Sequence, residues 1–151
     1  MNKIVTIPNL WVIETVDSES LADKLHKAWK KSEPLKIMIQ VNTSNEEQKN
    51  GLELNLVNKT YGHILNNCKN LDVTGLMTIG SVNESFNAES GLNQDFLNLI
   101  ECRSKLNSEF GLDQNKLELS MGMSSDFEKA IQMGSTSVRV GSLIFGEREK
   151  K

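Results

Sequence analysis

Short apolar runs rich in β-branched residues alternate along the chain with segments whose apolar residues recur every three or four positions. The first pattern predicts β-strands, and the second predicts amphipathic helices. Five strands are expected, with a helical segment between each strand and the next, and strands that alternate with helices indicate a parallel sheet. The expected strands are residues 10–16, 36–41, 71–79, 117–121 and 137–140.

Two α/β architectures fit this order of elements. One is a five-stranded doubly wound sheet. The other is an incomplete TIM (β/α)8-type barrel, since a complete barrel needs about 250 residues and this chain has 151. The pattern does not choose between the two, and no linker interrupts it, so we expect a single domain over residues 1–151.

Polar turns of small residues follow the last two predicted strands. One is Gly122–Asp126 and the other is Gly141–Gly146. Backbone N–H groups and hydroxyls in two such turns can converge on one anion, as in the phosphate sites of α/β barrels. Between the turns, Ser125 with Glu128 fits a capping box that begins a helix, and Gly134 fits its C-terminal cap.

Composition and charge exclude several classes of function. The net charge is −3 and no block of Lys and Arg occurs, which disfavours nucleic acid or an anionic membrane surface as a partner. No run approaches the roughly 20 apolar residues of a membrane-spanning helix. The N-terminus resembles neither a signal peptide nor a transit helix, so we expect a cytoplasmic protein.

The cysteines and histidines do not form a recognisable metal motif. Cys68 and Cys102 lie in separate helical segments without a CxxC partner. His26 and His63 also lie in helical segments, away from any Cys or Glu at ligand spacing. The sequence therefore predicts free thiols and no metal site.

Six short segments, in a fixed order, carry a family resemblance: Asn9–Trp11, Glu14–Ser18, Gln40–Ser44, Gly75–Gly80, Leu119–Ser124 and Arg139–Gly146. Together they resemble the pyridoxal phosphate homeostasis protein family (YggS/PROSC-like), whose fold is similar to the barrel domain of alanine racemase. The resemblance extends over essentially the whole chain. It favours the incomplete barrel over the doubly wound sheet and implies pyridoxal 5'-phosphate (PLP) as the cofactor.

The resemblance also implies which residues bind the phosphate of PLP. These are Ser124, Gly141 and Ser142, through hydroxyls, backbone N–H groups and the close approach that a glycine permits. Read without the resemblance, Ser124 is a helix N-cap and Gly141–Ser142 is an ordinary loop. Asn42 and Thr43 are weaker candidates for contact with the cofactor.

Arg139 is the fourth implied cofactor-binding residue, and it is expected to face the pyridine nitrogen. A guanidinium there keeps that nitrogen unprotonated and weakens the ring as an electron sink. From the residues alone, the alternative is an ion pair with a strand neighbour, Glu14 or Glu118.

The match begins partway through the family's fold, so its first three strands are expected to be absent. In the family, the lysine that forms the Schiff base with PLP lies at the end of the first strand, and no lysine here matches it. Lys36 opens a strand rather than ending one, which places it at the opposite rim.

Three functions are consistent with these observations. The first is a non-catalytic PLP-binding protein of vitamin B6 homeostasis, and the second is a degenerate fragment that keeps only a phosphate site. The third is a racemase-like enzyme, but a racemase needs two acid/base groups, and the one tyrosine, Tyr61, is expected in the packed face of a helix. We therefore expect no catalysis. Two open sheet edges, at 10–16 and 137–141, and an apolar inner face are expected to favour self-association.

Overall fold

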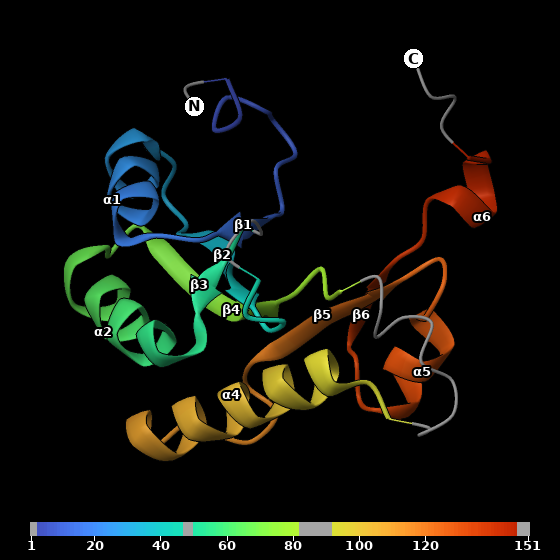
Figure 1. The fold of residues 1–151 in the computed structure, drawn as a ribbon. Helices are drawn as coiled ribbons and strands as arrows, with labels where there is room; N and C mark the ends of the chain where they lie inside the picture. The colour runs from blue at the N-terminus through green and yellow to red at the C-terminus, as the bar shows by residue number, and fades with distance from the viewer. Residues whose placement is uncertain (1–2, 47–49, 82–91, 148–151) are drawn as a thin grey trace.

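All the main strands of the computed structural model lie in one parallel sheet, which Figure 1 shows at the centre of the molecule. The structure describes residues 3–46, 50–81 and 92–147; the predicted loop at 81–93 lies almost wholly outside this part. Each strand pairs in parallel with its neighbours in the order β1-β2-β4-β5-β6. The strands are β1 (Val12–Val16), β2 (Leu35–Asn42), β4 (Leu71–Met77), β5 (Glu118–Met123) and β6 (Ser137–Arg139).

A sixth strand was not expected from the sequence. β3 (Leu52–Glu53) pairs in parallel with the end of β2. It has two residues, which is too short for a periodic pattern to indicate it. It pairs with the last two residues of β2, just beyond the residues of β2 that pair with β4.

The helices between the strands follow one another around the outside of the sheet, and the last helix stands apart from it (Figure 1). Ser18 begins the first helix, since its side chain accepts a hydrogen bond from the backbone N–H of Leu21. Asn93 and Gly111 bound the longest one, the glycine in the left-handed conformation typical of a helix end. The helices are α1 (Glu19–Ala28), α2 (Val57–Asn67), α4 (Gln94–Phe110), α5 (Phe127–Gln132) and α6 (Ser142–Phe145), with a 3-10 turn at Leu54–Leu56.

One apolar core lies between these helices and the outer face of the sheet. Outward-facing strand residues pack against the apolar faces of α1, α2 and α4. Burial of this surface is the main favourable contribution to folding. Fully buried members include Leu25, Ile37, Ile39, Ile64, Leu76, Phe96, Leu99, Leu106 and Leu119.

The sheet is strongly curved, as one hydrogen bond demonstrates. The Ser120 hydroxyl on β5 donates to Oε2 of Glu14 on β1 across 2.7 Å. Two strands separate β1 from β5, so in a flat sheet they would lie about 14 Å apart at three spacings of about 4.8 Å. The sheet therefore curls into a half-barrel, and of the two architectures the incomplete barrel is confirmed.

The start of α5 corrects one prediction. The N-cap is Asp126 rather than Ser124 or Ser125, and no side chain caps the helix. Instead the Asp126 carboxylate accepts the N–H of Met123 at 2.7 Å and closes the turn after β5. The end of α5 agrees with the prediction, because Gly134 has φ 96° and the N–H of Ser135 bonds Ala130 O at 2.9 Å, as in a Schellman motif.

The open edges are where the sequence predicted them, but the inner face is not wholly apolar. β1 and β6 form the two ends of the sheet order. The inner face carries polar side chains such as Glu14, Gln40 and Ser120. Large apolar side chains are exposed elsewhere: on α6 Leu143, Ile144 and Phe145 are 64%, 65% and 84% exposed. The inner face is therefore mixed rather than wholly apolar as predicted, because Met38 and Met77 lie inward beside these polar, hydrogen-bonded side chains.

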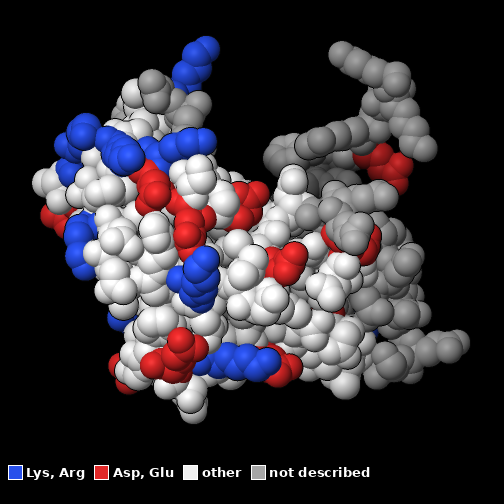
Figure 2. Space-filling model, turned by 60° about the vertical axis from the view of Figure 1, so that its left-hand side comes forward, with Lys and Arg blue, Asp and Glu red and all other residues white. Residues whose placement is uncertain are grey.

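The described surface carries charges of both signs. On the face drawn in Figure 2, acidic side chains lie among the lysines and arginines rather than apart from them. None of the helices in the described ranges is long and apolar enough to cross a membrane.

Candidate functional site

The two polar turns after β5 and β6 meet in the structure. The hydroxyl oxygen of Ser124 accepts a hydrogen bond from the N–H of Gly141 at 3.0 Å and a longer one from the N–H of Leu143 at 3.4 Å. Ser142 stands between these two donors and is the first residue of α6. Ser124, Gly141 and Ser142 therefore lie at one point, and two backbone N–H groups already converge there on a single oxygen atom.

The backbone conformation of Gly141 does not require a glycine. Its φ is −120°, which other residues adopt. A methyl group added at its Cα would meet no heavy atom within 4 Å. The space in front of this glycine is thus open, as a close approach by a phosphate would require.

The guanidinium of Arg139 bonds β5 and the residue that follows β4, and it reaches β1 through Ser120. Its Nη1 donates to the Ser120 hydroxyl at 2.6 Å, and its Nη2 donates to the carbonyl oxygen of Thr78 at 2.7 Å. Ser120 in turn donates to Glu14. We call these four residues the arginine network. Ser120 therefore lies between Arg139 and Glu14, one of the two carboxylates named as ion-pair partners, and hydrogen-bonds both.

The arginine network is partly buried, and this affects its charges. Burial lowers the pKa of the Arg139 guanidinium below its ordinary value, while the carboxylates of Glu14 and Asp126 oppose that shift. A guanidinium remains charged at neutral pH even so. Arg139 is therefore a fixed cation on the inner face of the half-barrel.

A cavity of about 240 Å³ opens beside this network at the carboxyl ends of β2 and β4. Asn42 and Thr43, the two weaker candidates, line it together with Thr78. The hydroxyls of Thr43 and Thr78 are hydrogen-bonded at 2.8 Å. Thr78 thus belongs to both the cavity wall and the arginine network.

Two residues that the enzyme hypothesis depends on lie away from this site. Tyr61 is buried in α2, where its ring packs against Phe110 with centroids 4.7 Å apart. Burial also raises the pKa of its phenol. Lys36, the one lysine in a described strand, lies at the amino end of β2 with its Nζ 3.6 Å from the centre of the Trp11 ring.

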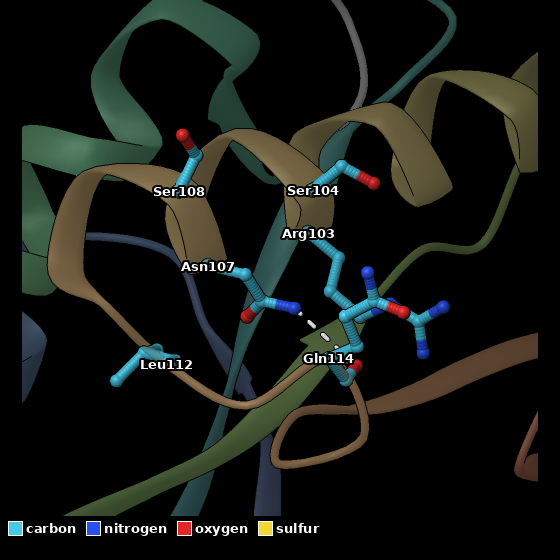
Figure 3. Close-up of a pocket in the computed structure, with 6 residues that line it drawn as sticks. All are labelled: Arg103, Ser104, Asn107, Ser108, Leu112 and Gln114. Carbon is cyan, nitrogen blue, oxygen red and sulfur yellow. Dashed lines mark hydrogen bonds between the residues drawn. The ribbon is translucent and has the colours of Figure 1, made fainter.

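A larger surface cavity, of about 380 Å³, contains none of the predicted site residues. Figure 3 shows it between α4 and the turn that follows. Its walls are largely polar, and the Asn107 side chain donates across it to the carbonyl oxygen of Gln114 at 3.3 Å. It is therefore separate from the inner face of the half-barrel.

Sequence reasoning did not select Ser120 or Thr78. Ser120 is fully buried between Leu119 and Met121, which belong to the outer core. A small polar residue between two apolar ones is the signal that would indicate an inward-facing position. Thr78 follows the last residue of β4 and contributes a backbone carbonyl, which no side-chain pattern reveals.

Comparison with known proteins agrees with this fold. The family model described as the alanine racemase, N-terminal domain, matches residues 2–149. The chain is 47% identical to the pyridoxal phosphate homeostasis protein of Mus musculus over 152 residues, which cover 99% of this chain and 55% of that protein. Among solved structures, PipY of Synechococcus elongatus PCC7942 with PLP bound has a TM-score of 0.72 and 25% identity, covering 97% of this chain and 66% of that one.

More distant relatives share the fold alone. An alanine racemase of Clostridium difficile 630 has a TM-score of 0.69 at 17% identity, over 100% of this chain and 38% of that one. The chain therefore belongs to the alanine racemase N-terminal domain family, and within that class to the pyridoxal phosphate homeostasis proteins. It spans about half the length of the curated relatives that it matches.

Proposed function

We propose that this chain binds PLP non-covalently in the cytoplasm, as a non-catalytic protein of vitamin B6 homeostasis. The observation that carries the proposal is the convergence of the N–H groups of Gly141 and Leu143 on one oxygen atom, that of Ser124. The relatives' name and the PLP found in PipY support the choice of ligand.

The donors present fit a phosphate. Two N–H groups point at one oxygen position, and the space before Gly141 is open. A phosphate oxygen can take the place of the Ser124 hydroxyl oxygen as acceptor, after which the hydroxyl turns and becomes a donor. The Ser142 hydroxyl adds another donor at the same point.

The arginine network fits the opposite end of the ligand. Arg139 is fixed by Ser120 and the carbonyl of Thr78, so its position does not depend on a ligand. A guanidinium cannot give up its proton at neutral pH, so a ring nitrogen facing it stays unprotonated. When bound, PLP supplies an electron-withdrawing ring, and Arg139 limits how strongly that ring withdraws electrons.

We also propose that no lysine of this chain bonds covalently to the PLP aldehyde. Lys36 lies at the amino ends of the strands, whereas the site lies at their carboxyl ends. The consequence is weaker binding, because a covalent link adds to the affinity of the other contacts.

Equilibrium titration with PLP, pyridoxal and inorganic phosphate tests the proposal. We expect PLP to bind reversibly, phosphate to compete with it, and pyridoxal to bind more weakly than PLP. Borohydride reduction followed by intact mass measurement should leave the chain without an added pyridoxyl group. A reduced lysine adduct would contradict the non-covalent assignment, and failure of phosphate to compete would contradict the site.

The same titration separates the alternatives. If the chain were a fragment with a phosphate site alone, PLP and inorganic phosphate would bind with equal affinity. Racemase activity would appear as loss of optical rotation of an L-amino acid in the presence of PLP. Ser104→Ala is a suitable control variant, since this exposed serine lies on α4 beside the separate cavity of Figure 3.

Self-association is the partner interaction that we propose. Strands β1 and β6 end the sheet, and α6 exposes three large apolar side chains. Exposed strand edges and apolar patches both favour association with another copy. Sedimentation velocity over a range of concentrations should show a dimer, and Phe145→Ser should shift it toward monomer; a concentration-independent monomer would contradict this.

A further inference from the structure

Two helices on the outside of the half-barrel bring together three side chains of the types that bind metal ions. Asp23 belongs to α1, His63 to α2, and Cys68 caps the end of α2. Nε2 of His63 lies 2.8 Å from Oδ1 of Asp23, and Sγ of Cys68 lies 3.4 Å from the same oxygen. We call this group the α1–α2 cluster. In Figure 1 its helices are at the left, away from α6.

The separations in the cluster suit a single small cation. One ligand atom from each side chain lies within 4.8 Å of the other two. A tetrahedral zinc ion with bonds of about 2.0–2.3 Å has its ligand atoms about 3.3–3.8 Å apart. The Asp23–Cys68 distance of 3.4 Å lies within that range and the Asp23–His63 distance of 2.8 Å lies below it, so small side-chain rotations are enough to enclose an ion.

Access to the cluster is one-sided. The side chains of His63 and Asp23 are 25% and 43% exposed, whereas Cys68 is fully buried. An ion can therefore enter from solvent and meet the thiol at the inner side. Three protein ligands leave a fourth position for water, as in zinc sites that are open to solvent.

A further carboxylate stands behind the imidazole. Oε2 of Glu19 lies 3.9 Å from Nδ1 of His63, the ring nitrogen that faces away from Asp23. The side-chain amide of Asn67 contacts the same nitrogen at 3.3 Å, so Glu19 reaches it as a hydrogen-bond acceptor only after that amide turns away. Carboxylates that accept the second N–H of a metal-bound histidine fix its tautomer and orientation. Glu19 is one helical turn before Asp23 on α1, so both carboxylates face the same ring.

We propose that the α1–α2 cluster binds one divalent transition-metal ion of the zinc class, through Cys68 Sγ, His63 Nε2 and an oxygen of Asp23. The mixed sulfur, nitrogen and oxygen donors disfavour magnesium and calcium, which prefer oxygen alone. On binding, the thiol proton passes to solvent and the thiolate takes its place at the metal. Bound metal joins α1 to α2.

The expectation of no metal site came from spacing along the chain. His63 and Cys68 are five residues apart, and Asp23 is forty residues earlier. Only the packing of α1 against α2 brings them together. The described residues contain this group, which the linear pattern does not reveal.

Titration with Co²⁺, followed by absorption spectroscopy and then by competition with Zn²⁺, tests the proposal on the full chain. We expect one ion per chain and a thiolate-to-cobalt charge-transfer band that Zn²⁺ removes. Cys68→Ser should abolish the band. His63→Gln should weaken binding at least tenfold, and Glu19→Gln should weaken it by about tenfold, as for other supporting carboxylates.

Cys102→Ser is the matched control. Cys102 is also buried and free but belongs to α4, so this variant should keep both the band and the affinity. The proposal would be overturned if the cobalt band survived in Cys68→Ser or if both cysteine variants lost the same metal affinity. It would also be overturned if the chain bound no stoichiometric amount of metal. If circular dichroism shows that Cys68→Ser does not fold, the part-exposed variants Asp23→Asn and His63→Gln decide; unchanged affinity in both would overturn the proposal.

Discussion

On β5, neighbouring residues on the two faces of the curved sheet are equally buried but are stabilised by different interactions. Leu119 and Ser120 are neighbours on β5 and both are fully buried. Leu119 points outward and packs in the core under the helices. Ser120 points inward and connects Arg139 to Glu14 by hydrogen bonds. The outer face thus stabilises the fold, and the inner face positions polar groups for a ligand.

The largest difference should appear when these neighbours are truncated separately. Leu119→Ala should lower the free energy of unfolding by about 2–5 kcal/mol, the usual cost of removing a buried leucine side chain. Ser120→Ala should cost less, about 1–3 kcal/mol, since it removes hydrogen bonds to two partly buried charged groups. Urea denaturation measures both values. Equal losses would mean that the inner network stabilises the fold as much as the core does.

Two glycines provide a sharper form of the comparison. Gly122 has φ 96°, and a Cβ there would lie 2.5 Å from the Cβ of Ala130. Gly122→Ala should therefore lower the free energy of unfolding by about 1–3 kcal/mol, through strain and overpacking. Gly141→Ala should change stability by less than about 0.5 kcal/mol, as for open surface positions, yet weaken PLP binding by about tenfold. Thermal denaturation and PLP titration of both variants test this, and normal PLP binding by Gly141→Ala would argue against the phosphate site.

Within the inner face, variants of the two polar turns and variants of the arginine network should affect the binding of different ligands. Ser124→Ala combined with Ser142→Ala should weaken the binding of inorganic phosphate and of PLP alike, by about tenfold, because both ligands carry the phosphate group that these turns bind. Arg139→Ala should weaken PLP binding but leave phosphate binding unchanged. The free energy of PLP binding should become less favourable by about 1.5–3 kcal/mol, the usual contribution of a hydrogen bond to a charged group. Competition titrations measure both. Equal losses of phosphate affinity in the two variants would contradict the assigned roles.

The last prediction concerns the core beneath the helices at high pH. Burial raises the pKa of the Cys102 thiol from its ordinary value of 9.0 to about 11. Between pH 9 and 11 the unfolded chain has lost this proton while the folded chain retains it, so the free energy of unfolding falls as the pH rises. Below pH 9 the contribution is complete. In Cys102→Ala the fall should be shallower by up to about 1.4 kcal/mol per pH unit; parallel curves would show that the thiol is not shielded.

Much of the fold follows from local pattern. The five main strands and the end of α5 at Gly134 are where the sequence predicts them, since a cap or an apolar period depends on residues close together along the chain. The start of α5 differed because the Asp126 carboxylate bonds the N–H of Met123. Two candidate N-caps lie just before it, and propensity does not rank them.

The sequence by itself determined the order of strands and helices, the polar turns after the last two strands, and the family. Only the tertiary structure decided that Ser120 lies between Arg139 and Glu14, and that Asp23 meets His63 and Cys68. The reason is physical: helix and turn formation depend on neighbours within a few residues, whereas these contacts join residues up to 106 positions apart. Such contacts exist only after the sheet has curled and α1 has packed on α2.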